Sequence, residues 1–289
     1  MASYFRPDTL EEALAIRAGQ PVTVLAGGTD VYPAQANRFG WGDMRRDDIL
    51  DISAIAELRG IEQTSERRRF GALTTWTELR RAALPAAFAG YQLAAKDVGG
   101  AQVQNRGTLV GNICTASPAG DGVPCLLSLD AEVELASATR RRTVPIKDFI
   151  TGYRQTVCGH DEIVTAIVIP KPNAGAVGDF LKLGARRYLV ISIAMAAAVV
   201  TTDERGVVTH ASIAVGACSE VAKRLTDLET ALIGEPLAAA PDLMVPEHFA
   251  ELKPIGDLRA SGHYRDSAAR DLVRDLFARL AGGSDRRAA

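Results

Sequence analysis

The sequence predicts an α+β protein with two domains, and two observations support this prediction. Helical and strand-like segments alternate through roughly the first 170 residues, whereas two long β-rich segments followed by helical patterns fill the rest. Between them, the proline- and glycine-rich stretch Pro170-Lys-Pro-Asn-Ala-Gly175 is typical of a domain boundary. We therefore expect a first domain over residues 1–172 and a C-terminal α+β domain over residues 173–289.

The first domain is expected to consist of short elements. Asp8, with Glu11 three residues later, is the expected N-cap of a helix that ends at Gly19. Thr75 and Glu78 form a second capping box. Strand-like runs cover residues 21–25, 49–52, 69–73 and 132–135, and helical patterns cover residues 75–84 and 85–96.

The segment from Gly99 to Gly122 differs from its surroundings, because it contains six glycines and almost no helical periodicity. We expect a long loop inside a packed domain, and such loops are usually functional. In the second domain, the β-rich segments 191–202 and 207–217 are joined by a hairpin turn. Helical patterns follow over 225–233 and 264–280, and the tail over 282–289 is expected to be frayed.

The composition is that of a globular protein and excludes several classes of function. Of the 289 residues, 47% are hydrophobic and 24% are charged, and the net charge of −2 provides no field that would gather nucleic acid or an anionic membrane. The longest apolar stretch, Leu189 to Val200, is far shorter than the roughly 20 residues that span a bilayer. The start carries no pattern of a secretory signal, so we expect a cytoplasmic protein.

The cysteines and histidines indicate neither a metal site nor a disulfide framework. The four cysteines contain no Cys-x-x-Cys pair, and the four histidines form no motif of metal-ligand spacing. Four scattered thiols in a chain of this length suit a reducing compartment. The two tryptophans, Trp41 and Trp76, are expected to be packing residues.

Two glycine-rich segments form the candidate site. Gly27-Gly28-Thr29-Asp30 follows a strand directly, and the second segment, within residues 107–121, also combines glycines with hydroxyl groups and one carboxylate. Backbone N–H groups beside glycine can converge on a phosphate, and threonine hydroxyls can complete its oxygen shell. The carboxylates of Asp30 and Asp121 suit ribose hydroxyls or ring N–H groups. Together the segments predict a dinucleotide-like cofactor.

Each segment alone also has a simpler interpretation. A lone Gly-Gly-Thr-Asp can be a plain tight turn, and Lys182, Arg186 and Arg187 can be a solvated strand edge. The sequence contains neither the glycine motif of a Rossmann site nor that of a P-loop. A dinucleotide must therefore be held in another way.

The two segments also carry a family resemblance. Leu25-Ala-Gly-Gly-Thr-Asp30 and Asn105-Arg-Gly-Thr-Leu-Val-Gly-Asn-Ile-Cys-Thr-Ala-Ser-Pro-Ala-Gly-Asp121 resemble the paired flavin loops of the FAD-binding medium subunit of molybdenum hydroxylases. This is the family of xanthine dehydrogenase and bacterial carbon monoxide dehydrogenase. The resemblance continues through residues 162–170, 180–187 and 261–265, so it covers almost the whole chain. The sequence departs from the family pattern at Val110, Gly120 and Val190.

The resemblance implies a fold of the vanillyl-alcohol-oxidase type, in which two subdomains, about 1–55 and 56–172, bind FAD between them and the C-terminal domain covers the flavin. The first loop would wrap the pyrophosphate, and the second would add phosphate and ribityl contacts. Asp121 would bind the adenosine ribose or nearby hydroxyls, and Lys182 would lie near the isoalloxazine. The implied FAD-binding residues are Ala26, Gly27, Gly28, Thr29, Asp30, Val31, Gly107, Thr108, Gly111, Asn112, Thr115, Asp121, Lys182, and Ile163 or Val164 packing by backbone near the adenine.

The resemblance further implies an oxidoreductase assembled from several subunits. A large subunit would hold the molybdenum cofactor, and a small subunit would hold two [2Fe–2S] clusters, for which this chain has no suitable set of cysteines. The chain would pass electrons onward from its FAD, within a dimer of heterotrimers. Two alternatives stay open at this point. One is a self-contained FAD-dependent oxidoreductase acting on a small molecule, and the other is an assembly subunit without a cofactor.

Overall fold

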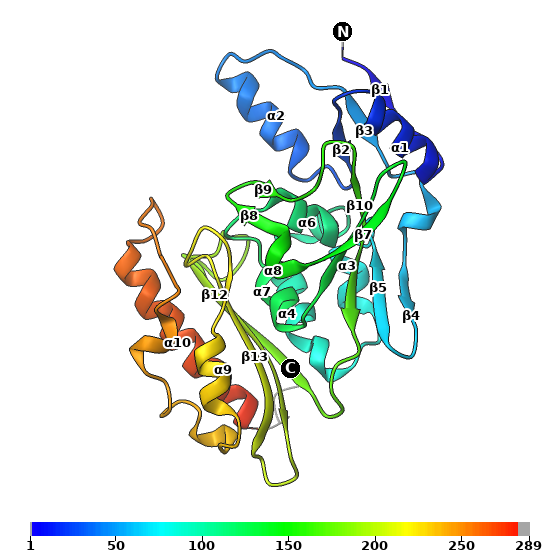
Figure 1. The fold of residues 1–289 in the computed structure, drawn as a ribbon. Helices are drawn as coiled ribbons and strands as arrows, with labels where there is room; N and C mark the ends of the chain where they lie inside the picture. The colour runs from blue at the N-terminus through cyan, green and yellow to red at the C-terminus, as the bar shows by residue number, and fades with distance from the viewer. Residues whose placement is uncertain (1, 283–289) are drawn as a thin grey trace.

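The structure, a computed structural model, describes residues 2–282. The tail over 282–289, which was expected to be frayed, lies outside the described residues except for Gly282. Figure 1 shows the N-terminal elements in blue at one end and the central part of the chain in cyan and green. The C-terminal sheet lies beside this centre, with helices on its outer side. The arrangement is α+β, as the sequence predicts.

A three-stranded parallel sheet with the order β1-β3-β2 starts the fold. Its strands and helices are β1 (Tyr4–Phe5), α1 (Leu10–Gly19), β2 (Thr23–Leu25), α2 (Val31–Gly40) and β3 (Ile49–Asp51). The N-cap of α1 is Thr9, whose hydroxyl accepts the N–H of Glu12. The prediction of Asp8 was therefore wrong by one residue, because Asp8 and Thr9 are both followed by a glutamate at the third position.

A five-stranded antiparallel sheet forms the centre, in the order β4-β5-β10-β6-β7. Its strands are β4 (Ile61–Gln63), β5 (Arg67–Gly71), β6 (Glu132–Ala136), β7 (Arg141–Pro145) and β10 (Ile163–Pro170). The other elements are η1 (Ala56–Leu58), α3 (Trp76–Arg81), η2 (Ala86–Phe88), α4 (Ala89–Asp97), α8 (Ile146–Phe149), β8 (Ile150–Gly152) and β9 (Gln155–Thr156). Every residue of the middle strand β10 except Pro170 is buried.

The two tryptophans have opposite surroundings. Trp76 is buried in the core at the start of α3, where the ring of Tyr91 meets it edge-on. Trp41, directly after α2, is 91% exposed, so the prediction that it is a packing residue was wrong. No residue of α2 is buried, so Trp41 follows a helix that takes no part in the hydrophobic cores.

The glycine-rich segment 99–122 is not the unstructured loop that its periodicity predicts. It contains α5 (Ala101–Gln104) and α6 (Leu109–Thr115), and it leads into α7 (Gly122–Ser128). All three helices are seven residues or shorter, so they are too short to show a repeat. In addition, all seven residues of α7 are buried, which leaves this helix without a polar face.

A four-stranded antiparallel sheet, ordered β11-β12-β13-β14, makes up most of the C-terminal part. Its strands are β11 (Val177–Leu183), β12 (Ala194–Thr202), β13 (Val208–Gly216) and β14 (Lys223–Arg224). The helices that follow are α9 (Thr226–Leu232), η3 (Leu237–Ala239), η4 (Pro246–Phe249) and α10 (Gly262–Ala281). The predicted hairpin joins β12 to β13.

Both faces of the C-terminal sheet are covered. α9 and α10 pack on its outer face, and α4 and α7 of the central part pack on the inner face (Figure 1). The alternation along β12 reflects this, because Met195, Ala197 and Val199 join the larger hydrophobic core. Ala194, Ala196 and Ala198 join the separate core beneath α10. The sheet therefore holds the two parts of the chain together.

Two glycines allow the backbones of the two parts to touch. A Cβ atom placed on Gly178 of β11 would lie 2.1 Å from the carbonyl oxygen of Ala87, and one placed on Gly90 of α4 would lie 2.6 Å from the carbonyl oxygen of Asp179. Real Cβ contacts are never this short, so any other residue at either position would push β11 away from η2 and α4.

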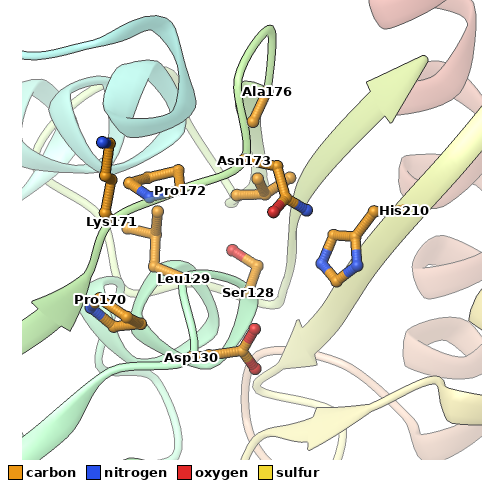
Figure 2. A pocket seen from close by; sticks show the side chains of 10 residues that line it. Ser128, Leu129, Asp130, Pro170, Lys171, Pro172, Asn173, Ala176 and His210 are labelled. Atoms are coloured by element: carbon orange, nitrogen blue, oxygen red, sulfur yellow. The ribbon is translucent and has the colours of Figure 1, made fainter. Parts of the chain in front are cut away.

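The loop between β10 and β11 lines a pocket of about 120 Å³ (Figure 2). The end of α7 and residues of β12 and β13 form the other walls of this pocket. Ser128 and Asp130 face it from one side, and His210 faces it from β13. None of the residues implied for FAD lines this pocket. The predicted boundary between residues 172 and 173 falls in this loop, and the division into domains stays a prediction.

Candidate functional site

The first glycine segment is a tight turn between a parallel strand and a helix. β2 ends at Leu25, Gly28 has a left-handed φ of 75°, and α2 begins at Val31. The turn brings the first N–H groups of α2, which have no partner inside the helix, to the carboxyl end of β2. A helix start in this position is suited to an anion such as a phosphate.

The second glycine segment lies directly against the first. A Cβ atom placed on Gly27 would lie 1.9 Å from the carbonyl oxygen of Arg106, and one placed on Gly107 would lie 3.2 Å from Oγ1 of Thr29. The two segments are far apart in the sequence, and they can meet this closely only because position 27 is glycine. The structure therefore brings together the two loops that the sequence analysis paired.

The start of α6 is organised by Thr108. Its Oγ1 accepts the N–H of Gly111 at 3.0 Å and caps the helix, and Thr108 also forms a β-bridge with Thr75. Val110, one of the three departures from the family pattern, turns its side chain into the core and is 5% exposed. The valine is thus accommodated inside the protein, on the buried side of the helix.

Asn112 presents a polar atom that the protein itself does not satisfy. Among the described residues, no hydrogen-bond partner reaches its buried Oδ1. Its carboxamide lies beside Gly120 and Gly122, because Cβ atoms placed there would come within 3.4 Å and 3.0 Å of Oδ1. A buried acceptor without a partner is rare in folded proteins, and it fits a site that receives a donor from a ligand.

Asp121 and Lys182 form a buried ion pair between the central part and the C-terminal sheet. Nζ of Lys182 lies 2.6 Å from Oδ2 of Asp121, and the two side chains are 8% and 7% exposed. The hydroxyl of Ser192 donates to Oδ1 of Asp121 at 2.5 Å. Burial raises the pKa of the Asp121 carboxyl, and the Lys182 ammonium and the Ser192 hydroxyl oppose that rise. Lys182 is therefore no solvated edge residue, whereas Arg186 and Arg187 are exposed.

Asp30, the last residue of the first loop, binds an arginine. Its Oδ2 accepts from Nη1 of Arg154 at 3.2 Å, and both side chains are nearly half exposed. The N–H of Arg154 donates to the carbonyl oxygen of Ala116, at the end of α6. Sequence reasoning missed this contact because the two residues are 124 positions apart and Arg154 belongs to no motif.

Ile163 and Val164 lie at the start of β10, whose neighbours include α6. Both are buried, and the pairing with β6 is irregular directly after Val164. The preceding Glu162 fixes this end of the strand, because its carboxylate accepts from Arg142 at 2.7 Å on both oxygens and from the N–H of Gly159 at 2.7 Å. The hydrogen bonds from Arg142 lower the pKa of Glu162 to about 2.

The chemical groups collected here suit a flavin dinucleotide. They are glycine backbone, the start of α2, threonine hydroxyls, one unsatisfied amide oxygen and a buried Asp–Lys pair. Within residues 2–282, no group of three or more His, Cys, Asp or Glu side chains is placed to hold a metal ion. The same residues contain no helix with the length and apolar character needed to cross a membrane.

Comparison with known proteins identifies the class. Residues 1–172 match the model of the FAD-binding domain in molybdopterin dehydrogenase, and residues 179–280 match that of the CO dehydrogenase flavoprotein C-terminal domain. The chain therefore belongs to the family of FAD-binding subunits of molybdopterin dehydrogenases. It is the flavoprotein component of an oxidoreductase, and FAD is its cofactor. The resemblance seen in the sequence and the expected fold class are confirmed.

Individual relatives match along nearly their full length. The FAD-subunit of nicotinate dehydrogenase from Eubacterium barkeri is 30% identical, over 95% of this chain and 94% of the relative. The medium chain of carbon monoxide dehydrogenase from Hydrogenophaga pseudoflava is 29% identical, over 94% of each. Among solved structures, reconstituted CO dehydrogenase from Oligotropha carboxidovorans matches with a TM-score of 0.89 and 25% identity, over 98% of this chain and 99% of the other.

Proposed function

We propose that this chain is the electron-transfer subunit of a multi-subunit molybdenum-dependent hydroxylase. It would receive electrons from the two [2Fe–2S] clusters of a small partner subunit and deliver them to an external acceptor, while a large partner subunit holds the molybdenum cofactor. The names of its relatives support this, because they describe a medium chain or a FAD-subunit of a dehydrogenase. We further propose a cytoplasmic dimer of heterotrimers.

The observation that carries the proposal is the direct contact between the two glycine segments at Gly27 and Arg106. The first loop supplies the free N–H groups at the start of α2, and the second loop places glycine backbone and the Thr108 hydroxyl beside this turn, an arrangement that suits a pyrophosphate. The residues that would hold FAD are those named from the sequence: Ala26, Gly27, Gly28, Thr29, Asp30, Val31, Gly107, Thr108, Gly111, Asn112, Thr115, Asp121, Ile163, Val164 and Lys182.

These residues would bind and orient the cofactor and would not themselves react. FAD, when bound, accepts electrons singly or in pairs and so joins one-electron carriers to a two-electron acceptor. The backbone of Gly27 and Gly28, in the first loop, would carry the phosphate contacts. The ion pair of Asp121 and Lys182 would keep one fixed positive and one fixed negative charge in a region from which water is excluded.

The relay is tested with the purified full chain and its partners. We expect a yellow protein that releases FAD, and not FMN, on denaturation, because two loops exceed the needs of a single phosphate. Substrate should bleach the flavin only after the iron–sulfur and molybdenum subunits are both added. Bleaching by an aromatic or purine substrate in the isolated chain would overturn the relay in favour of a self-contained oxidoreductase, and a colourless protein would favour the assembly subunit.

A further inference from the structure

The C-terminal part binds the end of the second cofactor segment at two points, one through a side chain and one through the backbone. At the first, Ser192 donates to Asp121, whose other oxygen accepts from Lys182. At the second, the N–H of Ala217 donates to the carbonyl oxygen of Pro118 at 3.0 Å. Both contacts end on residues 117–121, the last part of the loop Asn105–Asp121 that resembles a flavin loop, in which Asp121 is the residue implied to bind FAD.

A single buried arginine holds the backbone at both positions. Nη1 of Arg265, in the first turn of α10, donates to the carbonyl oxygen of Ile193 at 2.5 Å and to that of Ala217 at 2.9 Å. Ile193 is the neighbour of Ser192, and Ala217 is itself the donor to Pro118. Arg265 is 5% exposed, and its Nη2 donates to Asp257 at 2.7 Å.

The conformation at Ala217 requires this arrangement. Ala217 has a left-handed φ of 61°, which an alanine adopts only when surrounding contacts impose it. Its N–H is bound by Pro118 and its carbonyl by Arg265, so the two hydrogen bonds fix opposite sides of one strained residue. Because a guanidinium is planar and has five donors, it can bind several segments at once, which an ammonium cannot do in the same geometry.

We infer that Arg265 is a positioning residue for the cofactor. It sets the placement of Ser192 and Ala217, and through them the placement of residues 117–121 and of the Asp121–Lys182 pair. The inference rests on the proposed role of Asp121 and Lys182 at the flavin. It assigns to α10 a part in cofactor binding, although this helix lies on the outer face of the C-terminal sheet (Figure 1).

Arg224 provides a matched comparison. It is also a partly buried arginine that joins the C-terminal sheet to the central part, since it binds the carbonyl oxygen of Leu127 at 3.0 Å and the carboxylates of Asp130 and Glu229. Leu127 and Asp130 lie at the end of α7 and Glu229 lies on α9, so none of these contacts involves residues 117–121. Replacing Arg224 should therefore cost stability without altering the cofactor loop.

The test compares Arg265→Met, Arg265→Lys and Arg224→Met in the full chain. FAD is the probe, its dissociation constant is measured by fluorescence quenching, and the visible circular dichroism of the bound flavin reports its surroundings. We expect Arg265→Met to weaken FAD binding about tenfold, the equivalent of one hydrogen bond to a charged group, and to change the dichroism. Arg265→Lys should recover part of the affinity, and Arg224→Met should stay within about twofold of the natural chain.

Several outcomes contradict the inference. Unchanged FAD affinity and dichroism in Arg265→Met overturn it. An equal loss of FAD affinity in Arg224→Met also overturns it, because both losses would then follow from reduced stability. If Arg265→Met does not fold, Arg265→Lys decides, because unchanged FAD affinity and dichroism in that variant overturn the inference as well. A natural chain that fails to bind FAD would instead contradict the proposed function.

Discussion

Gly27 controls how closely the two cofactor loops approach each other, and Gly28 controls the direction of the turn. The two residues have different physical requirements. Gly27 has no room for a side chain, whereas Gly28 has a left-handed backbone and would also bring a Cβ atom to 2.8 Å from the ring of Tyr32. From the sequence alone, Gly28→Val is expected to lower the flavin occupancy of the protein far more than its stability, so that the fold stays intact. The positive φ implies a cost in stability as well.

Gly27→Ala should destabilise the chain by about 3 kcal/mol, because its methyl group would overlap the carbonyl oxygen of Arg106 and separate the loops. Urea unfolding measures this change. Gly19→Ala is the control, since Gly19 ends α1 and a Cβ atom there would meet nothing within 4 Å. We expect the control to be neutral or stabilised by up to about 1 kcal/mol. Equal effects of the two substitutions would contradict the close contact.

Thr108→Ala separates cofactor binding from helix capping. Losing the cap of α6 should cost about 1 kcal/mol of stability, and losing the hydroxyl should also weaken FAD binding. Thr9→Ala removes a cap of the same kind from α1, where Thr9 accepts the N–H of Glu12. We expect Thr9→Ala to lose similar stability while it keeps its FAD affinity. Thermal unfolding and FAD titration of both variants distinguish the two effects, and equal FAD affinities would remove Thr108 from the site.

Among the elements, β10 depends most on one side chain. Glu162 lies at the start of this central strand and is 1% exposed. It binds Arg142 of β7 and the turn at Gly159, so it joins the strand to an edge of the sheet. The placement of Ile163 and Val164, which are proposed to lie near the adenine, follows from this anchor.

Glu162→Gln should lose about 2 kcal/mol of stability at pH 7. The pKa of Glu162 in the folded chain is about 2, below the value of about 4.5 that an exposed glutamate has. The contribution of its charge is therefore complete above about pH 4.5 and disappears as the pH falls toward 2. Urea unfolding between pH 7 and pH 2.5 should show the two chains converging. A difference that stays constant with pH would contradict the role of the charge.

The sequence predicts elements well where a helix has one apolar face or a strand has a bounded apolar run. α10 follows its predicted range closely, since it alternates buried residues such as Val273 and Phe277 with charged ones. α2 was not predicted, and none of its residues is buried. α7 was not predicted either, because all of it is buried. A helix shows a periodic sequence pattern only when it has both a solvent-exposed face and a buried face.

In the whole molecule, the Asp121–Lys182 pair joins the central part to the C-terminal sheet. The sequence identifies both residues as site candidates, but their pairing depends on how two separately patterned segments pack. Local spacing contains no information on that packing. The same holds for Arg154 and Asp30, and for Arg265, whose partners lie 72 and 48 positions away. The glycine loops were predictable because their chemistry is local. The contacts of the side chains that hold these loops in place were not predictable, because their partners lie far away in the sequence.

Removing one member of the Asp121–Lys182 pair should lower the free energy of unfolding more than removing both. Asp121→Asn and Lys182→Met should each cost about 3 kcal/mol at pH 7, because each leaves a polar or charged partner buried alone, while the double variant should lie within about 1 kcal/mol of the natural chain. Burial raises the pKa of Asp121, so the deficit of Lys182→Met should shrink as the pH falls toward 4. Additive losses in urea unfolding would contradict a coupled buried pair.

The paired glycines Gly90 and Gly178 have a consequence for how such proteins can be recombined. β11 can lie against η2 and α4 only if positions 90 and 178 both lack a Cβ atom. A chimera that joins residues 1–172 of this chain to the C-terminal part of a relative will assemble only if the relative also brings glycine to the position of Gly178. This single contact therefore restricts which halves can be exchanged, whatever the similarity of the rest of the two sequences.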